Sequence, residues 1–154
     1  MSILGLGHDV VDVAAFSEQL AEPGSRMRRL FSPRELRQAS MRAQIKHDGE
    51  AVHLAARWAG KEAVLKAWCE ALGDVPNPYT LDDFPWQGIE ILDDSRGRPH
   101  VALRSDVNDR LAESLGSRSS GAPSSGSRLS GEPIWHISLS HDGPVASAVV
   151  LLEC

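Results

Sequence analysis

The stretch Trp58–Trp68, WAGKEAVLKAW, lies in the middle of the longest helical pattern of the chain. It is rich in alanine, leucine, lysine and glutamate, which favour helices, and no proline interrupts the pattern from Glu50 to Gly73. At about 100° per residue, five large apolar side chains share an arc of roughly 80°. These are Leu54, Trp58, Leu65, Trp68 and Leu72. We therefore expect a long helix that packs along the core.

Two charged residues interrupt this apolar arc. Lys61 projects into its middle, and Glu62 lies at its edge. A buried charge costs several kcal/mol unless it is paired or holds an ion. The ordinary explanation is a solvated pair of Glu62 with Lys66, four residues later, while Lys61 extends its ammonium group into water. The alternative is a functional site on the helix, and the rest of the sequence has to decide between the two.

Length and composition indicate one compact domain over residues 1–154. A chain of this size with 42 % hydrophobic residues can bury a core, and no apolar run approaches the roughly 18 residues of a membrane span. The N-terminus MSILGLGHDVV lacks the basic segment of a signal peptide. The two cysteines, Cys69 and Cys154, make neither a disulfide framework nor a zinc site. We therefore expect a reduced, cytoplasmic protein.

The charge is unevenly distributed. The net charge is −5, yet residues 26–46 carry seven cations against one acid, Glu35. Such a segment in an acidic chain indicates a local anionic partner, or simply an arginine-rich helix face in solvent. A nucleic-acid-binding domain would be basic overall with interleaved aromatic residues, and aromatic residues are only 5 % of this chain.

The order of the expected elements predicts an α+β fold, with an antiparallel sheet against the long helix. Ile3–Val11 is expected to be a strand in which Gly5 and Gly7 thin one face or let another group approach closely. Ser32 and Glu35 form a capping box that starts a helix. The remaining expected elements are a hairpin over 88–103, a helix over 106–115, a flexible Gly/Ser-rich loop over 116–131 and a final hairpin over 134–153.

Three polar residues occupy positions where burying an apolar side chain would cost less free energy. Asp9 is inside the first strand, Glu62 is on the long helix, and His141 ends the strand that begins at Ile134. Each has an ordinary explanation when taken singly, such as a strand-end cap or a surface histidine. Together, two carboxylates, several cations and a histidine suit a hard metal ion that binds phosphates through oxygen ligands. The chain has no GxxxxGK[ST] loop, which excludes a P-loop enzyme.

Five motifs, in order along nearly the whole chain, resemble the holo-acyl-carrier-protein synthase family of 4′-phosphopantetheinyl transferases. They are GLGHDVV, FSPREL, ARWAGKEAVLKAW, the GRP of the first hairpin and WHISLSHD. The resemblance implies the fold of that family and a homotrimer with its sites at the subunit interfaces. It also implies transfer of phosphopantetheine from coenzyme A to a serine of an acyl carrier protein, or of a carrier domain in a fatty-acid or polyketide synthase. The other product is adenosine 3′,5′-bisphosphate.

The same resemblance assigns roles to residues of the motifs. Asp9 and Glu62 would be the Mg²⁺ ligands, and Lys66 would face the pyrophosphate as the third catalytic residue. Arg57, Lys61, Lys66 and His141 would contact coenzyme A, with the charge of Lys61 satisfied at a subunit interface. The serine proton would pass either to Glu62 or to a metal-bound water, and the sequence leaves both open.

The chain departs from the family pattern in the helix after the first strand. Family members that act on small acidic carriers often have an arginine where this chain has Ala15. Arg26, Arg28 and Arg29 are therefore the expected substitutes for carrier binding. Two other functions stay open, a Mg²⁺-dependent nucleotide pyrophosphatase and a non-catalytic relative that only binds the carrier. The intact set of Asp9, Glu62 and Lys66 counts against the non-catalytic relative, whereas the pyrophosphatase would use the same acids with water as the nucleophile.

Overall fold

Two antiparallel sheets and one long helix make up the architecture. The computed structural model describes residues 1–118 and 131–154. In chain order, the elements are β1 (Ile3–Asp12), α1 (Val13–Ala21), the 3₁₀ turn η1 (Met27–Leu30), α2 (Pro33–Lys46), α3 (Glu50–Leu72), the 3₁₀ turn η2 (Trp86–Gly88), β2 (Ile89–Asp93), β3 (Pro99–Leu103), α4 (Ser105–Arg118), β4 (Ile134–Asp142) and β5 (Val145–Glu153). The predicted α+β fold, with its long helix and two hairpins, is confirmed.

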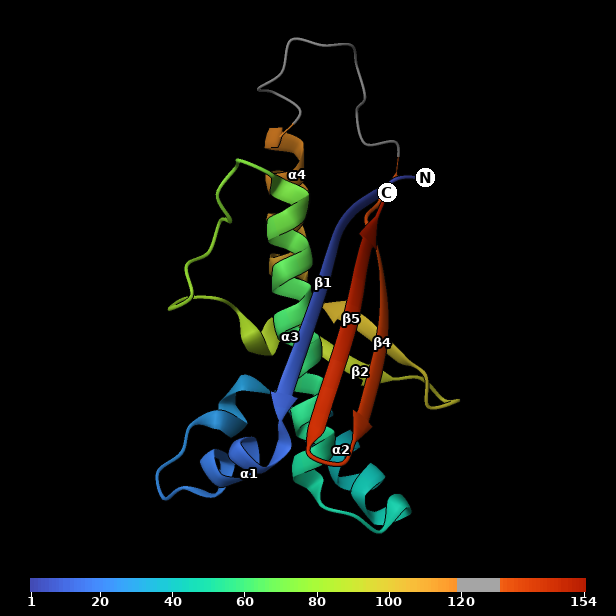
Figure 1. Ribbon diagram of the computed structural model, residues 1–154. Coiled ribbons are helices and arrows are strands. Elements are labelled where there is room, and N and C mark those ends of the chain that lie inside the picture. Colours follow the sequence, from blue (N-terminus) through green and yellow to red (C-terminus); the bar gives the residue numbers. More distant parts are fainter. Residues whose placement is uncertain (119–130) are drawn as a thin grey trace.

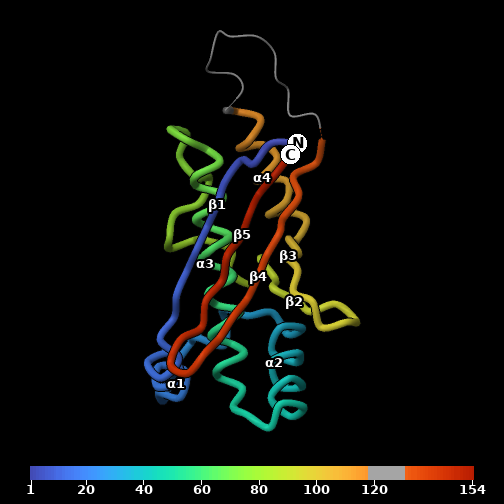
Figure 2. Tube along the Cα trace, turned by 45° about the vertical axis from the view of Figure 1, so that its right-hand side comes forward, coloured from blue at the N-terminus to red at the C-terminus, as the bar shows by residue number. Residues whose placement is uncertain are grey.

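The sheet with strand order β1-β5-β4 lies along α3. In the view of Figure 1, α3 lies behind this sheet, and α4 lies farther back beside the upper part of α3. The second sheet pairs β2 with β3, and Figure 2 shows it above α2. Both chain ends lie at one end of the long sheet, while α1 and α2 lie at the other (Figure 1). No helix in the described part of the chain is long and apolar enough to cross a membrane.

The glycines of β1 bring the main chains of β1 and α3 into direct contact. A methyl group on Gly5 would overlap the carbonyl oxygen of Ala67, and one on Gly7 would overlap that of Ala63. Larger residues at these positions would push the helix away from the sheet. The predicted close approach at these two glycines is therefore confirmed, and the group that approaches is the backbone of α3.

Local capping sets the ends of the helices. The side chain of Ser32 accepts a hydrogen bond from the Glu35 amide, and the side chain of Glu35 accepts one from the Ser32 amide, which is the predicted capping box. Gly73 ends α3 with a φ of 60°. At the end of α2, His47 adopts the left-handed conformation, with a φ of 54°, where glycine is usual.

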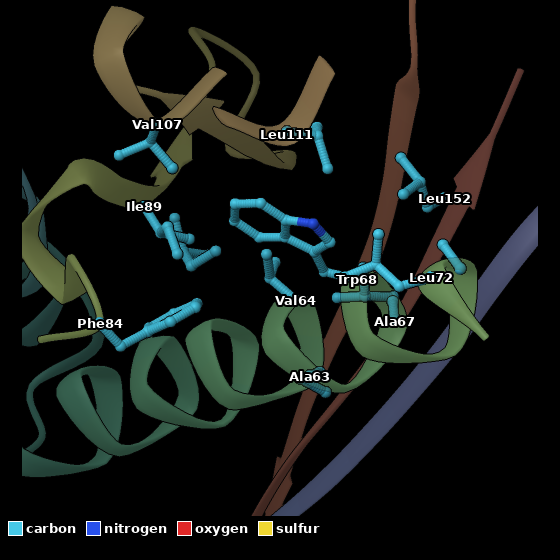
Figure 3. Packing of buried hydrophobic residues seen from close by; sticks show 14 of the residues in the cluster. Ala63, Val64, Ala67, Trp68, Leu72, Phe84, Ile89, Val107, Leu111 and Leu152 are labelled. Carbon is cyan, nitrogen blue, oxygen red and sulfur yellow. The ribbon is translucent and has the colours of Figure 1, made fainter. Parts of the chain in front are cut away.

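The helix α3 is buried on most of its circumference within the chain itself. Trp68 points from α3 toward Ile89, Val107 and Leu111 (Figure 3), so β2 and α4 cover it. Leu54 and Leu72 are buried as well, and Trp58 and Leu65 are half-buried. The expectation that much of this apolar arc meets another subunit is wrong, because β2, α4 and other parts of the same chain already exclude water from it.

The helix α4 is longer than expected. It continues through Arg118, whereas the composition predicted a loop from Gly116 onward. Residues 119–130 of that predicted loop lie outside the described residues.

Candidate active site

Asp9 and Glu62 face each other between β1 and α3. Asp9 lies on the same side of β1 as Gly5 and Gly7 and is buried, and Glu62 precedes Ala63, whose carbonyl group contacts Gly7. Burial is the main cause that raises the pKa of Glu62 to about 7. A hydrogen bond in which protonated Glu62 donates to Asp9, and repulsion by the Asp9 charge, add to the shift, and Lys66 opposes it. Two carboxyl groups that are close enough to share a hydrogen bond do not both ionise easily unless a cation lies between them.

Lys66 completes this group of residues from the next turn of α3. Its ammonium group lies 2.9 Å from Asp9 Oδ1 and donates to the carbonyl oxygen of His8, also at 2.9 Å. Its side chain is 53 % exposed, so one donor remains for a ligand in solvent. One turn farther along, Glu70 accepts a hydrogen bond from the Leu6 amide, so α3 also covers polar groups on the free edge of β1.

The arrangement fits a hard cation held by few protein ligands. The second oxygen of Asp9, Oδ2, is buried and receives no hydrogen bond from the described residues. No cluster of three or more His, Cys, Asp or Glu side chains suited to a metal occurs among residues 1–118 and 131–154. Asp9 and Glu62 would therefore supply two oxygen ligands, and water and substrate phosphates would supply the rest, as is usual for Mg²⁺.

Lys61 has a different role from the predicted one. It is 0 % exposed, and its ammonium group donates to Glu35 Oε1 at 2.7 Å and to the carbonyl oxygens of Trp86 and Ile89 at 2.7 and 2.5 Å. Burial lowers the pKa of Lys61 below its ordinary value, and the nearby Glu35 offsets only part of this shift. The predicted contact of Lys61 with coenzyme A is wrong, because all three donors are used inside the core. The expected subunit interface around this charge is wrong for the same reason.

Arg57 of α3 and His141 of β4 each contact His53, near the start of α3. The guanidinium group of Arg57 is buried and donates to Asp93 Oδ2 at 3.1 Å and to the carbonyl oxygen of His53 at 3.2 Å. The ring of His141 packs edge-to-face on the ring of His53, with 5.9 Å between centroids. Within one chain, the residues predicted to bind coenzyme A therefore lie at two places. Lys66 is beside Asp9, whereas Arg57 and His141 lie against His53.

A pocket of about 370 Å³ opens between β1, α1, η1 and α3. Glu62 and Asp12 supply carboxylates to its wall, and Phe16, Met27 and Trp58 are among its apolar lining. Neither Arg57 nor His141 lines it. The sequence contained no signal for this pocket, because its residues come from four elements with no common spacing.

The three arginines expected to bind the carrier lie beside this pocket, in and before η1. Arg28 is already paired, with its guanidinium nitrogens 3.0 and 3.3 Å from the two carboxylate oxygens of Glu50. Arg26 and Arg29 are exposed, and no carboxylate of the described residues forms an ion pair with them. Of these three arginines, Arg26 and Arg29 therefore remain available to a partner.

Two facing carboxylates beside an exposed lysine suit an enzyme that acts on phosphate esters with a metal ion. The sequence model of the 4′-phosphopantetheinyl transferase superfamily matches residues 5–125, which include Asp9, Glu62 and Lys66. This chain therefore belongs to the 4′-phosphopantetheinyl transferase superfamily, and the resemblance of its motifs is confirmed.

Relatives along the full length agree with this assignment. A holo-[acyl-carrier-protein] synthase of Bifidobacterium animalis subsp. lactis is 58 % identical over 98 % of each chain. A holo-[acyl-carrier-protein] synthase of Corynebacterium glutamicum is 35 % identical over 97 % of this chain and 98 % of its own. Among solved structures, the ACPS–CoA complex of Chronobacterium ammoniagenes superposes with a TM-score of 0.81 at 34 % identity, covering 99 % of this chain and 98 % of that one.

Proposed function

We propose that this chain transfers the 4′-phosphopantetheine group of coenzyme A to a serine of an acyl carrier protein, with Asp9 and Glu62 as its magnesium ligands. The transferase activity rests on the superfamily and on relatives that are named holo-[acyl-carrier-protein] synthases. The observation that carries the metal assignment is the facing pair of Asp9 and Glu62, with the exposed ammonium group of Lys66 beside it.

Each residue of this group has a distinct task in the proposed transfer. Asp9 and Glu62 hold the metal, which when bound supplies positive charge to the phosphate oxygens of the substrate. Lys66 has a donor directed toward solvent and stabilises the negative charge that develops on the leaving phosphate oxygen. Because the pocket beside Glu62 is open, a carrier serine that approaches over α1 and η1 reaches this carboxyl group directly.

The carrier is proposed to dock over η1 through Arg26 and Arg29. Arg28, which the sequence included in this set, contributes less because Glu50 already neutralises it. Carrier binding is then partly electrostatic and has an apolar component from the pocket wall around Met27.

We also propose the homotrimer that the motifs imply. On the face of the sheet away from α3, several apolar side chains are exposed, among them Leu6, Val10 and Val149. In a single chain, Arg57 and His141 are not part of the pocket beside Glu62, so an assembly that joins the two groups at an interface accounts for both. A cytoplasmic location belongs to the same proposal, and it is supported by Cys69 and Cys154, which are both free.

The test is incubation with coenzyme A, Mg²⁺ and an apo carrier protein, followed by mass spectrometry of the carrier. The expected result is a phosphopantetheine adduct on one serine and an equal amount of adenosine 3′,5′-bisphosphate. Release of that nucleotide without any carrier would instead identify a pyrophosphatase. Carrier binding with no adduct would identify a non-catalytic relative.

A further inference from the structure

A buried histidine lies behind His141 and has no role in the proposed transfer. His53, on the first turn of α3, is 5 % exposed, and its ring stands at 86° to the ring of His141 at the end of β4. His141 itself is exposed, so its ring has solvent on one side and His53 on the other. A polar ring that is buried at this position needs a partner.

The partner of His53 is Asp48, in the short connection between α2 and α3. His53 Nε2 lies 2.6 Å from Asp48 Oδ1, which is the distance of a strong hydrogen bond to a carboxylate. This bond places a proton on Nε2 and fixes the rotation of the ring. On the main chain, the carbonyl oxygen of His53 accepts a hydrogen bond from Arg57, whose guanidinium group is tied to Asp93. Side chain and backbone of His53 are both held.

Because the ring of His53 is held by Asp48, it restricts the ring of His141 that packs on it. Because the edge-to-face contact with His53 limits the rotation of His141, part of the ordering that a ligand would otherwise impose is already present. An imidazole suits an anionic ligand, since its N–H group donates to a phosphate oxygen. The charged groups around His53 are Asp48 on one side and Arg57 on the other, and both are engaged in the contacts described.

We infer that His53, oriented by Asp48, is a positioning residue that sets the ring of His141 for contact with coenzyme A. The inference rests on the proposed function, because it takes His141 as a coenzyme A contact. It assigns no contact with substrate to His53 itself. The effect should therefore appear in the binding of coenzyme A and not in the chemical step.

The test uses His53→Phe, which keeps an aromatic ring and loses the bond to Asp48, and Asp48→Ala, which removes the bond from the other side. Each should raise the KM for coenzyme A by about 2- to 10-fold, the range for one side chain that must be ordered on binding. The kcat and the KM for carrier should stay within twofold. Asp48→Asn keeps an acceptor oxygen and should restore most of the affinity, and Asp48→Ala added to His53→Phe should cost nothing further. His100→Phe, at an exposed histidine of β3, is the matched control and should change nothing.

Calorimetric titration with coenzyme A alone separates the possible failures, since it needs no turnover. Unchanged affinity in His53→Phe and Asp48→Ala, with an active wild type, overturns the inference and leaves the proposed function intact. A lower kcat, higher KM values for both substrates and a lower thermal stability, all in the same variant, also overturn it, because they mean that His53 only supports the fold. A wild type that neither binds coenzyme A nor modifies a carrier defeats the proposed function, and this inference with it.

Discussion

Lys61 of α3 and Glu35 of α2 form an ion pair that solvent does not reach. Their charged atoms are 2.7 Å apart, both side chains are 0 % exposed, and Glu35 also accepts hydrogen bonds from the amides of Ser32 and Ile91, each at 3.0 Å. The pair joins the start of α2 to the middle of α3 and to β2. Its full set of hydrogen bonds is what makes two buried charges tolerable.

The first prediction concerns this pair. Lys61→Met leaves Glu35 buried without its cation and should lower the free energy of unfolding by about 3–5 kcal/mol. Urea denaturation followed by tryptophan fluorescence measures the change. The matched control is Arg104→Met, which breaks an exposed pair with Asp106 and should cost less than about 1 kcal/mol. A loss below 1 kcal/mol in Lys61→Met would contradict this account of the core.

The second prediction concerns the contact of β1 with α3. Gly7→Ala places a methyl group against the carbonyl oxygen of Ala63. It should destabilise the protein by about 1–3 kcal/mol, because the backbone has to move. Activity should fall as well, since the two carboxylates are carried by the two elements that separate. Gly116→Ala is the control: it is helical, has open space around it, and should stabilise by about 0.5–1 kcal/mol. Equal melting temperatures for the two variants would contradict the close contact between Gly7 and Ala63.

The third prediction concerns the end of α2. His47→Gly should stabilise the protein by about 0.5–1 kcal/mol, because His47 holds a positive φ that glycine adopts without strain. Thermal unfolding measures the gain. Gln44→Gly, at an exposed position inside the same helix, should instead cost about 1 kcal/mol. A loss of stability in His47→Gly would mean that the imidazole makes a compensating contact.

The fourth prediction tests the metal ligands. Asp9→Asn and Glu62→Gln should each reduce transfer by several orders of magnitude, as expected for loss of a catalytic metal. The wild type should melt at a higher temperature when Mg²⁺ is added, since the ion binds the folded state, and neither variant should show that increase. Glu18→Gln, at an exposed acid of α1, is the control and should behave as the wild type. Near-normal turnover of either variant at saturating Mg²⁺ would show that the substituted residue is not a metal ligand.

The fifth prediction concerns the carrier. Arg26→Glu and Arg29→Glu should raise the KM for carrier by about 2- to 10-fold and leave the KM for coenzyme A nearly unchanged, as expected for charges at the rim of an interface. The effect should shrink as salt is added. Arg37→Glu, in the exposed middle of α2, serves as the control for a general effect of charge. Equal effects of all three reversals would point to nonspecific attraction.

Much of the site was predictable because its signals are local or periodic. The capping box at Ser32 and the stop at Gly73 depend on a few neighbouring residues. Asp9 was conspicuous as a charge inside a strand, and Glu62 as a charge at the edge of an apolar helix face. The elements followed from these local patterns, whereas the joint role of Asp9 and Glu62 was implied by the resemblance of the motifs to a known family.

The partner of Lys61 was not predictable in the same way. Glu35 lies 26 residues away, and its capping role already gave it a sufficient explanation. The helix α3 also had more buried surface than one arc suggested, because α4 and β2 cover the side opposite the sheet. Both facts depend on how elements pack, and no local spacing encodes that packing.

The glycines of β1 also determine how closely the distance between the Asp9 and Glu62 carboxylates is fixed. Where side chains separate a strand from a helix, each substitution between them changes the spacing of the two elements. Here Gly5 and Gly7 leave no side chain to change, so the separation of Asp9 from Glu62 follows from the dimensions of the peptide chain itself. Substitutions on the outer face of the sheet, in α4 or in the surface loops can therefore accumulate while the two carboxylates keep their spacing.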